Sequence, residues 1–338
     1  NQVANRLWIA DYVSRKTNGD VYDFSELANL SGSDTVGIQR LGVLRADVDN
    51  LGAAFIGGFI NHRKENLFHF NTFSRYADLS RSLSMFFKAG VNKIVSGNSN
   101  GIDDIRDTYH LWGEDNREKG HIHVIYSGGD DVFLVGPWDE LLEVAVDIRK
   151  RLRDLTDGKL TISAGLGMFT HSFPITKMAE ITGELETVAK DMPTKDSIAL
   201  FGFDTSNLGQ KPTCHHVYQW DQLIDRVLDG KFKMLQSLLA VSRDGVVSDT
   251  SRMPFMRSSM YRIMELLEEI VKENSDRIHK ARLLYTLSRM EPEKAMEQQK
   301  EAYRKFVATM YDWIQTKEST REVLTAIHLL IYSLREKV

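Results

Sequence analysis

Residues 121–135 read HIHVIYSGGDDVFLV, and this stretch decides the predicted fold. An apolar segment, a turn of Ser, Gly and Asp, and a second apolar segment together predict a buried antiparallel hairpin. Two consecutive glycines supply the positive φ angles that a short turn needs. The adjacent carboxylates of Asp130 and Asp131 repel each other and resist burial, so we expect a cation to neutralise them. The alternative is a plain surface turn, because Gly and Asp are the commonest turn residues.

A second acidic cluster follows another apolar segment and favours the metal interpretation. Residues 41–49 read LGVLRADVD, which predicts a strand that ends at Asp47. Asn50-Leu51-Gly52 follow and begin a predicted helix. Two strand ends that each supply carboxylates are what a two-metal site for nucleotidyl transfer requires. Asp49 has a simpler interpretation as the N-cap of that helix.

Magnesium or manganese is the predicted cofactor, because Mg²⁺ prefers oxygen ligands and is usually held by one or two carboxylates together with substrate phosphates. The predicted metal ligands are Asp47, Val48, Asp130 and Asp131, and the three aspartates are also the predicted catalytic residues. Backbone N–H groups at a helix start can cradle phosphate oxygens, and lysines before the last strand of the sheet can balance the triphosphate charge. The predicted nucleotide-binding residues are therefore Asn50, Leu51, Gly52, Ser127, Gly128, Gly129, Lys190 and Lys195.

The apolar periodicity predicts an α+β domain with a ferredoxin-like sheet. Besides the hairpin, the pattern indicates helices over 51–60, 76–95, 138–155 and 175–189 and strands over 41–47, 160–169 and 197–203. The order β, α, β, β, α, β is the ferredoxin-like arrangement, to which one helix and one strand are appended. In that sheet the first strand lies beside the hairpin, so Asp47 and the GGDD turn are expected at one edge. The helix over 138–155 carries a charged face on the side away from the core.

A change of pattern near residues 205 to 220 predicts two domains. Residues 1–39 read as an N-terminal linker segment, 40–210 as the α+β domain and 219–338 as an all-α helical bundle. In the bundle, apolar residues recur every three or four positions over 223–239, 253–271, 276–287, 295–314 and 320–334. Ser319-x-x-Glu322 predicts a capping box for the last helix. A stripe of methionines is assigned to the bundle core, with a partner-binding face as the alternative; it comprises Met253, Met256, Met260 and Met264.

Composition and absent motifs exclude several classes of protein. A net charge of −4 argues against a surface coated in basic nucleic-acid-binding residues. The single cysteine, Cys214, excludes internal disulfides and multi-cysteine zinc sites, and the run Cys214-His215-His216 is interpreted as surface polar residues. No P-loop, EF-hand or His-Asp hydrolase signature occurs. No apolar run is long enough to cross a membrane and no signal peptide opens the chain, so a cytoplasmic location is predicted.

Four segments carry a resemblance to a known family: RADVDNLG from Arg45, YSGGDDVFLVGPW from Tyr126, LTISAGLG from Leu160 and KDSIALF from Lys195. In order and spacing they resemble the second Palm domain of the large subunit of type III CRISPR effector complexes, and their wording is closest to the III-A branch. The part of the chain after residue 219 resembles the C-terminal helical domain of that subunit. The resemblance covers nearly the whole chain.

The resemblance implies an activity, a metal site and partners. The activity is joining ATP by 3′–5′ bonds into cyclic oligoadenylates, an antiviral second messenger made when target RNA is bound. The metal carboxylates map onto Asp47, Asp130 and Asp131. The implied partners are ATP, other subunits of the effector complex, guide RNA and target RNA, with no membrane.

Departures from the family pattern limit what the resemblance implies. The family's HD nuclease domain, first Palm domain and zinc element are not visible, so DNA cleavage is not carried over. The chain does not begin with methionine, and we expect it to be a fragment. Because the family binds one ATP on each Palm domain, the isolated chain is expected to make little product.

Two alternatives stay open at this point. One is a diguanylate cyclase, whose related turn has Glu and Phe where Asp131 and Val132 stand here. The other is a catalytically silent scaffold that docks neighbouring subunits and guide RNA.

Overall fold

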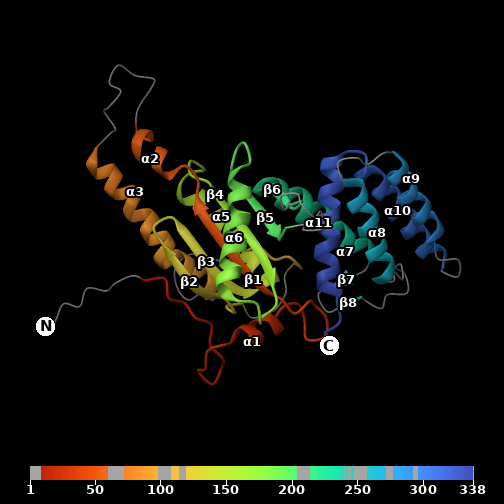
Figure 1. Cartoon of the computed structure of the whole chain (residues 1–338), viewed down its shortest axis with the longest axis horizontal. Coiled ribbons are helices and arrows are strands. Elements are labelled where there is room, and N and C mark those ends of the chain that lie inside the picture. Colours follow the sequence, from red (N-terminus) through yellow and green to blue (C-terminus); the bar gives the residue numbers. More distant parts are fainter. Residues whose placement is uncertain are drawn as a thin grey trace, which may run out of the picture. The chain divides into compact units, whose positions relative to one another are not determined.

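The computed structural model describes residues 9–59, 72–97, 108–113, 119–203, 214–239, 241–242, 245–246, 257–271, 277–291 and 296–337. The chain divides into two compact units, which are described separately. The sheet unit comprises Asn1–Ser31 and Arg40–Gln219, and the helical unit comprises Gly32–Gln39 and Trp220–Val338. Figure 1 shows the elements of each unit along the chain.

The sheet unit is built on a six-stranded sheet with the order β2-β3-β1-β4-β5-β6. The strands are β1 (Leu41–Val48), β2 (His123–Gly128), β3 (Asp131–Pro137), β4 (Ile162–Phe169), β5 (Ser197–Phe201) and β6 (Val217–Gln219). β1 pairs antiparallel with both β3 and β4, and β5 joins β4 in parallel. The four central strands therefore have the predicted ferredoxin-like order, and β5 and β6 extend the sheet.

Helices cover both faces of this sheet, as Figure 1 shows. The helices of this unit are α1 (Phe24–Asn29), α2 (Leu51–Gly57), α3 (Phe73–Met85), the π-helical turn η1 (Phe86–Gly90), α4 (Val91–Ser96), α5 (Trp138–Leu155) and α6 (Ile175–Lys190), of which α2 buries no residue. Alternate residues of β1 point to opposite faces. Leu41 and Val43 pack with Leu27 of α1 and Met178 of α6. Gly42, between Leu41 and Val43 in the strand, faces α5 on the opposite side of the sheet. An added Cβ there would lie 2.7 Å from the Cα of Trp138.

The acidic side chains of α5 from Asp139 to Asp147 are buried, contrary to the prediction that the charged face lies away from the core. Residues 108–113 and 119–121 lie over it, and its carboxylates accept their backbone N–H groups. Glu140 accepts from Gly120 at 2.7 Å, Glu143 from Leu111 at 2.9 Å and Asp147 from Tyr109 at 2.8 Å. The carboxylates thus satisfy the backbone donors of a segment that lacks regular secondary structure.

Part of the predicted linker contributes to the sheet unit. Asp23 and Glu26 form a capping box for α1, and Leu27 and Ala28 of that helix are fully buried. Residues 32–39 instead belong to the helical unit, where the Ile38 N–H donates to the Tyr332 carbonyl at 2.7 Å. Within the described residues, the stretch from Asp23 to Gln39 is therefore packed structure.

Helices make up most of the described residues of the helical unit. Its described elements are the π-helical segment η2 (Gln222–Phe232), α7 (Lys233–Leu239), α8 (Arg257–Val271), α9 (Arg277–Arg289), α10 (Glu297–Trp313), α11 (Lys317–Leu334) and the short strands β7 (Val241–Ser242) and β8 (Gly245–Val246). Most of α11 is buried. Met260 is buried as predicted and Met264 is half-buried, whereas Met253 and Met256 lie outside the described residues.

The predicted cap of the last helix is wrong. The helix begins at Lys317, and its N-cap is Thr316, whose hydroxyl accepts the Ser319 N–H at 3.2 Å. Glu322 is buried and pairs with Lys231 instead of capping the helix. Glu322 therefore pairs with the buried ammonium of Lys231, and the predicted box of Ser319 and Glu322 does not form.

Candidate functional site

The GGDD segment forms the tight turn of the β2–β3 hairpin. Gly129 has φ +73°, as at the first central position of a type II′ turn, while Gly128 is the last residue of β2 and has no positive φ. The prediction that both glycines supply positive φ was wrong, because a two-residue turn of this type needs only one. Asp130 completes the turn, and its carbonyl accepts the Val48 N–H at 3.1 Å.

Strand register brings the predicted carboxylates together. Asp47 of β1 lies directly opposite Asp131 of β3. Residues directly opposite in an antiparallel pair project to the same face with Cβ atoms about 4.5–5.5 Å apart. Burial, and then the charges of Asp47 and Asp131, raise the pKa of the Asp130 carboxyl. The three aspartates thus form one electrostatically coupled group.

A lysine from α6 forms an ion pair with this group. Lys190 is the last residue of α6, and its ammonium donates to Asp47 and to Glu186, the latter at 2.7 Å. Burial lowers the pKa of Lys190, but the hydrogen bonds to these two carboxylates outweigh burial and raise it overall. Lys190 was predicted to contact the nucleotide. In this structure it neutralises a predicted metal ligand.

Three residues beside the carboxylates were missed at the sequence level. Glu186 is buried between Lys190 and Arg45, whose Nε lies 3.0 Å from its carboxylate. Tyr126 donates its hydroxyl to the Gly128 carbonyl at 3.2 Å, and the charge of Asp131 raises its pKa. The predicted helix over 175–189 ended one residue before Lys190; only its extension to Lys190 would have shown the (i, i+4) spacing of Glu186 and Lys190.

The start of α2 differs from its prediction. The N-cap position is Asn50, in the left-handed region at φ 54°, and its side chain makes no capping bond. Asp49 is not the N-cap, because its buried carboxylate accepts hydrogen bonds from Thr161 and Asp196 instead. Lys195 donates its ammonium to Asn50 Oδ1 at 2.7 Å. Two residues predicted to bind nucleotide, Asn50 and Lys195, are thereby brought together.

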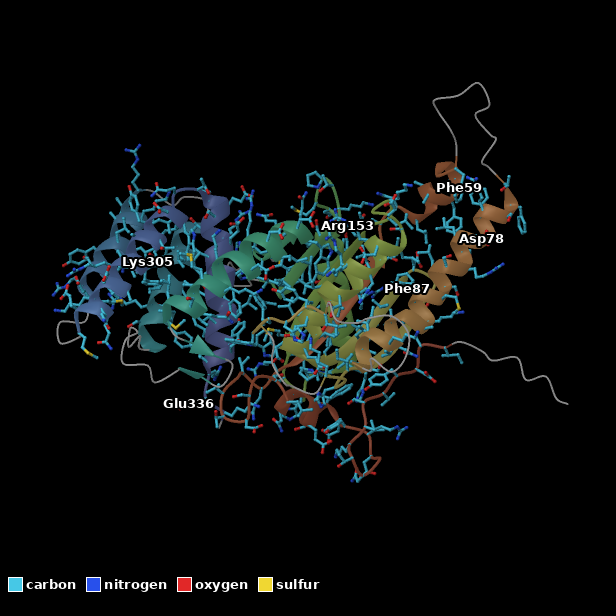
Figure 2. All side chains as sticks on the ribbon, turned by 180° about the vertical axis from the view of Figure 1, so that it is seen from behind. Phe59, Asp78, Phe87, Arg153, Lys305 and Glu336 are labelled. Atoms are coloured by element: carbon cyan, nitrogen blue, oxygen red, sulfur yellow. The ribbon has the colours of Figure 1, made fainter. Side chains whose placement is uncertain are left out.

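The remaining predicted residues differ in exposure. Leu51 is half-buried in the first turn of α2, and open space lies where a Cβ on Gly52 or Gly129 would stand. Ser127 is buried, and its hydroxyl donates at 2.6 Å to the carbonyl of Phe87, which is labelled in Figure 2. The Ser127 hydroxyl therefore ties the end of β2 to the π-helical turn η1.

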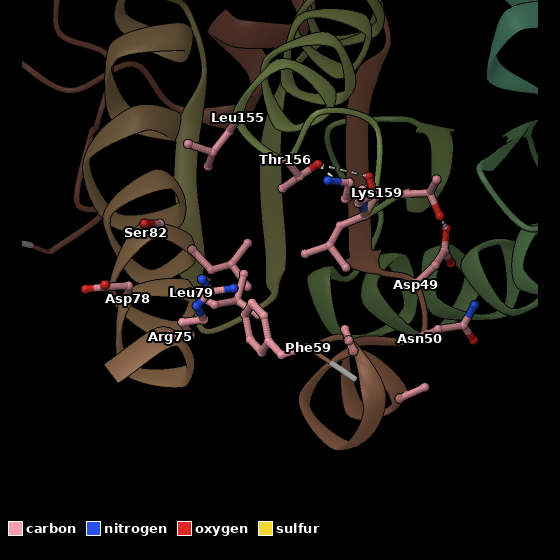
Figure 3. A pocket seen from close by; sticks show the side chains of 16 residues that line it. Asp49, Asn50, Phe59, Arg75, Asp78, Leu79, Ser82, Leu155, Thr156 and Lys159 are labelled. Atoms are coloured by element: carbon pink, nitrogen blue, oxygen red, sulfur yellow. Dashed lines mark hydrogen bonds between the residues drawn. The ribbon is translucent and has the colours of Figure 1, made fainter. Parts of the chain in front are cut away.

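A cavity of about 650 Å³ opens beside Asp49 and Asn50. Figure 3 shows it between α2 and α3, with Arg75 and Leu79 on one side and Asn50 on the other. Phe59 and Asp78, both labelled in Figure 3, also line it. Its volume lies within the range of about 300–1,000 Å³ typical of small-molecule sites. No sequence motif predicted this cavity, because three stretches that lie far apart in the sequence line it.

The donor set fits a divalent cation that substrate helps to hold. Within the described residues, no three His, Cys, Asp or Glu side chains converge into a ready-made metal cluster. Asp47 and Asp131 nevertheless lie directly opposite each other, and Asp130 is the turn residue that precedes Asp131. Mg²⁺ is usually bound by one or two carboxylates and completes its shell with waters and substrate phosphates. Asp47, Val48, Asp130 and Asp131 remain the predicted ligands.

Cys214 is half-buried and packs against a small core cluster of Leu185, Ala189 and Ala199. Its thiol donates to the Leu200 carbonyl at 3.7 Å, and burial raises its pKa to about 11. The neighbouring His216 stacks edge-on against Phe201. The interpretation of this run as surface polar residues was therefore wrong for the thiol, which is largely removed from solvent.

Comparison with known families identifies both units. Residues 40–199 match the second palm domain of Cas10/Cmr2, and residues 255–336 match the second helical domain of the Cmr2 subunit of the CRISPR RNA silencing complex. The chain belongs to the Cas10/Cmr2 family. The predicted family and the predicted fold of a palm domain followed by a helical domain are confirmed.

Curated Cas10/Cmr2 relatives align along nearly the whole chain. A Cas10/Csm1 of subtype III-A from Mycobacterium tuberculosis, named a single-strand-specific deoxyribonuclease, is 34% identical over 98% of this chain and 35% of its own length. The Enterococcus italicus protein of the same name is 35% identical over 99% of this chain and 35% of its own length. The chain thus spans about a third of the length of the curated relatives it matches.

Solved Csm1–Csm4 structures share this fold. The complex with AMPPNP superposes with a TM-score of 0.68 at 25% identity over 98% of this chain and 40% of that chain. The complex with cA3 gives a TM-score of 0.67 at 27% identity over 97% and 40% of the two chains. A third, with one ATP, gives 0.67 at 26% identity over 97% and 40%.

Proposed function

We propose that this chain is the catalytic palm and helical part of a type III-A effector subunit that joins ATP into 3′–5′ cyclic oligoadenylates. The observation that carries the proposal is the register of Asp47 opposite Asp131 at the GGDD turn. Related Csm1 proteins with ATP, AMPPNP or cA3 support the substrate and product class. Membership of the family favours this function over a diguanylate cyclase.

The residues of the site divide into those that would hold metal and those that would balance the phosphate charge. Asp47, Asp130 and Asp131, with the Val48 carbonyl, would hold Mg²⁺ or Mn²⁺. A pair of such ions activates an attacking hydroxyl and stabilises a leaving pyrophosphate. Lys195, whose ammonium reaches Asn50 at the start of α2, would balance the triphosphate charge, and Lys190 would be released to it when a metal takes over the Asp47 carboxylate.

The cavity beside Asn50 would take the nucleoside of the bound ATP. It combines apolar walls at Leu79 and Phe59 with polar groups at Arg75 and Asp78. This is the mixture that orients a flat polar base between apolar surfaces. Triphosphate at the α2 start and nucleoside in the cavity would place both halves of ATP on one side of the hairpin.

One palm domain holds one nucleotide, so a second palm surface must supply the acceptor. In-line attack requires the hydroxyl about 3–3.5 Å from the α-phosphorus, and such positioning contributes on the order of 7–11 kcal/mol to lowering the barrier. We propose that this surface, Csm4-like subunits, guide RNA and target RNA complete the cytoplasmic effector. None of the helices in the described residues is long and apolar enough to cross a bilayer.

Labelled ATP and GTP, offered separately with Mg²⁺ or Mn²⁺, test the proposal in the chain alone and in the assembled effector with target RNA. We expect ATP-derived rings from the assembly and little product from the chain alone. The variant Asp130→Ala/Asp131→Ala should lose product by several orders of magnitude while remaining folded, and exposed Asp154→Ala is the matched control. Product from the folded double variant would refute the metal assignment. GTP-derived product would favour a diguanylate cyclase. A complete assembly that makes no product from either nucleotide would favour a scaffold.

A further inference from the structure

Asp49 is a buried carboxylate that the proposed catalytic scheme does not use. It is 3% exposed and lies at the rim of the cavity in Figure 3. Its N–H donates to the Thr161 carbonyl at 2.8 Å, and its Oδ2 accepts the Thr161 hydroxyl at 2.8 Å and the Asp196 N–H at 3.0 Å. In the described part of the chain, Asp49 Oδ1 has no hydrogen-bond partner. One oxygen therefore joins β1, the start of β4 and the loop before β5.

The loop that Asp49 holds has an unusual backbone. Lys195 and Asp196 have φ angles of 52° and 45°, a left-handed region that L side chains rarely adopt. Hydrogen bonds hold Lys195 and Asp196 in this conformation. The Lys195 N–H donates to the Met192 carbonyl at 2.9 Å, and the Ser197 hydroxyl donates to the Lys195 carbonyl at 2.6 Å. Arg149 Nη2 bonds the Asp196 carboxylate at 2.7 Å.

This conformation decides where the Lys195 ammonium lies. The side chain crosses to Asn50 Oδ1 at 2.7 Å, at the start of α2. Asn50 is itself left-handed, with φ 54°. Asp49 connects the two left-handed residues of this contact, Asn50 and Lys195. It precedes Asn50 in the chain, and its carboxylate accepts the N–H of Asp196, which follows Lys195. If the Asp196 N–H loses its acceptor, the loop can relax and carry the ammonium away.

We propose that Asp49 is a positioning residue that acts through the Asp196 N–H to hold Lys195 at the triphosphate site, and that it is not a metal ligand. The inference rests on the proposed function, because it takes the triphosphate to lie at the α2 start. This positioning role requires only a hydrogen-bond acceptor, charged or uncharged, at the place of Asp49 Oδ2. The geometry therefore distinguishes Asp49 from Asp47, two positions before it, whose charge faces Asp131 and Lys190.

Asp49→Asn and Asp49→Ala separate these roles, with Asp47→Asn as the matched control. Asn keeps one oxygen for Thr161 and Asp196 and places its amide where Oδ1 makes no bond. We measure AMPPNP affinity, Mn²⁺ binding without nucleotide, and hydrogen exchange of the 191–197 segment in the full chain. Asp49→Ala should weaken AMPPNP binding and accelerate exchange at Asp196, each by roughly tenfold or more, as expected for losing a hydrogen bond to a charged acceptor. Asp49→Asn should stay within threefold of the wild type in both, and Mn²⁺ binding should change only in Asp47→Asn.

A double-mutant cycle with Lys195→Ala isolates the route of the effect. If Asp49 acts through Lys195, adding Asp49→Ala to Lys195→Ala costs no further AMPPNP affinity. Full additivity would overturn the proposal, as would equal losses in Asp49→Asn and Asp49→Ala, or unchanged exchange at Asp196 in Asp49→Ala. Asp49→Ser, polar but too short to reach Asp196, replaces Asp49→Ala if that variant does not fold. If the wild-type chain binds no AMPPNP, the proposed function fails, and exchange at Asp196 still decides whether Asp49 holds the loop.

Discussion

Asp147→Asn should change how the stability of the sheet unit depends on pH. Asp147 is 6% exposed on α5, and burial raises the pKa of its carboxyl from 3.8 to about 7. Its Oδ1 accepts the Tyr109 N–H, Glu143 raises its pKa further, and Lys119 and Lys150 oppose the shift. Because the folded-state pKa is raised, the associated stability is fully present at low pH and is lost as pH rises from about 4 through 7.

The magnitude follows from the size of the shift. Each pH unit between the unfolded and folded pKa values costs about 1.4 kcal/mol. An ionisable carboxyl at this position therefore costs about 2 kcal/mol at pH 5 and about 4 kcal/mol at pH 8, as upper values. Asn keeps the acceptor for Tyr109 and cannot ionise. The stability difference between Asp147→Asn and the wild type should thus shift by about 2–3 kcal/mol in favour of the variant between these pH values.

Urea unfolding of both proteins at pH 5, 6, 7 and 8, followed by circular dichroism, measures this shift. A fixed cost of burying the amide moves all four differences equally and does not affect the test. Asp154→Asn, on the exposed end of the same helix, is the control and should change stability by no more than about 0.5 kcal/mol at any pH. If the Asp147→Asn difference is constant from pH 5 to 8, the carboxyl does not titrate near 7 and the burial argument is wrong.

Three further predictions concern the site and its support. Asp47→Asn should weaken Mn²⁺ binding at least tenfold by titration, because it removes one of two facing carboxylates; unchanged affinity would exclude it as a ligand. Gly165→Ala should cost about 1–3 kcal/mol in unfolding experiments, because the new Cβ would lie 2.5 Å from the Thr182 carbonyl and displace α6. Gly183→Ala, which meets only a flexible side-chain end, should not destabilise α6 comparably. Iodoacetamide at pH 8 should modify Cys214 about two orders of magnitude more slowly in the folded chain than in urea, since its pKa is about 11; equal rates would place the thiol in solvent.

The sequence alone determined the architecture around the hairpin. Alternating apolar residues, a Gly-Asp turn and helical spacing are local signals, and together they predicted the ferredoxin-like strand order with Asp47 and the GGDD turn at one edge of the sheet. The same motifs carried the family resemblance, which the comparisons confirmed. Local patterns suffice here because strand period and turn chemistry act within a few residues.

Only the tertiary structure decided how the charged side chains are used. Lys190 reaches Asp47 from 143 residues away in the sequence, and Asp49 bonds Asp196 rather than capping α2. The charged face of α5 was predicted to face solvent, yet it is covered by a segment whose N–H groups it satisfies. Periodicity records which residues are polar but not which distant donor or acceptor will meet them. A buried charge settles on whatever partner the packed fold brings within reach, because leaving it unpaired costs far more than a local cap contributes.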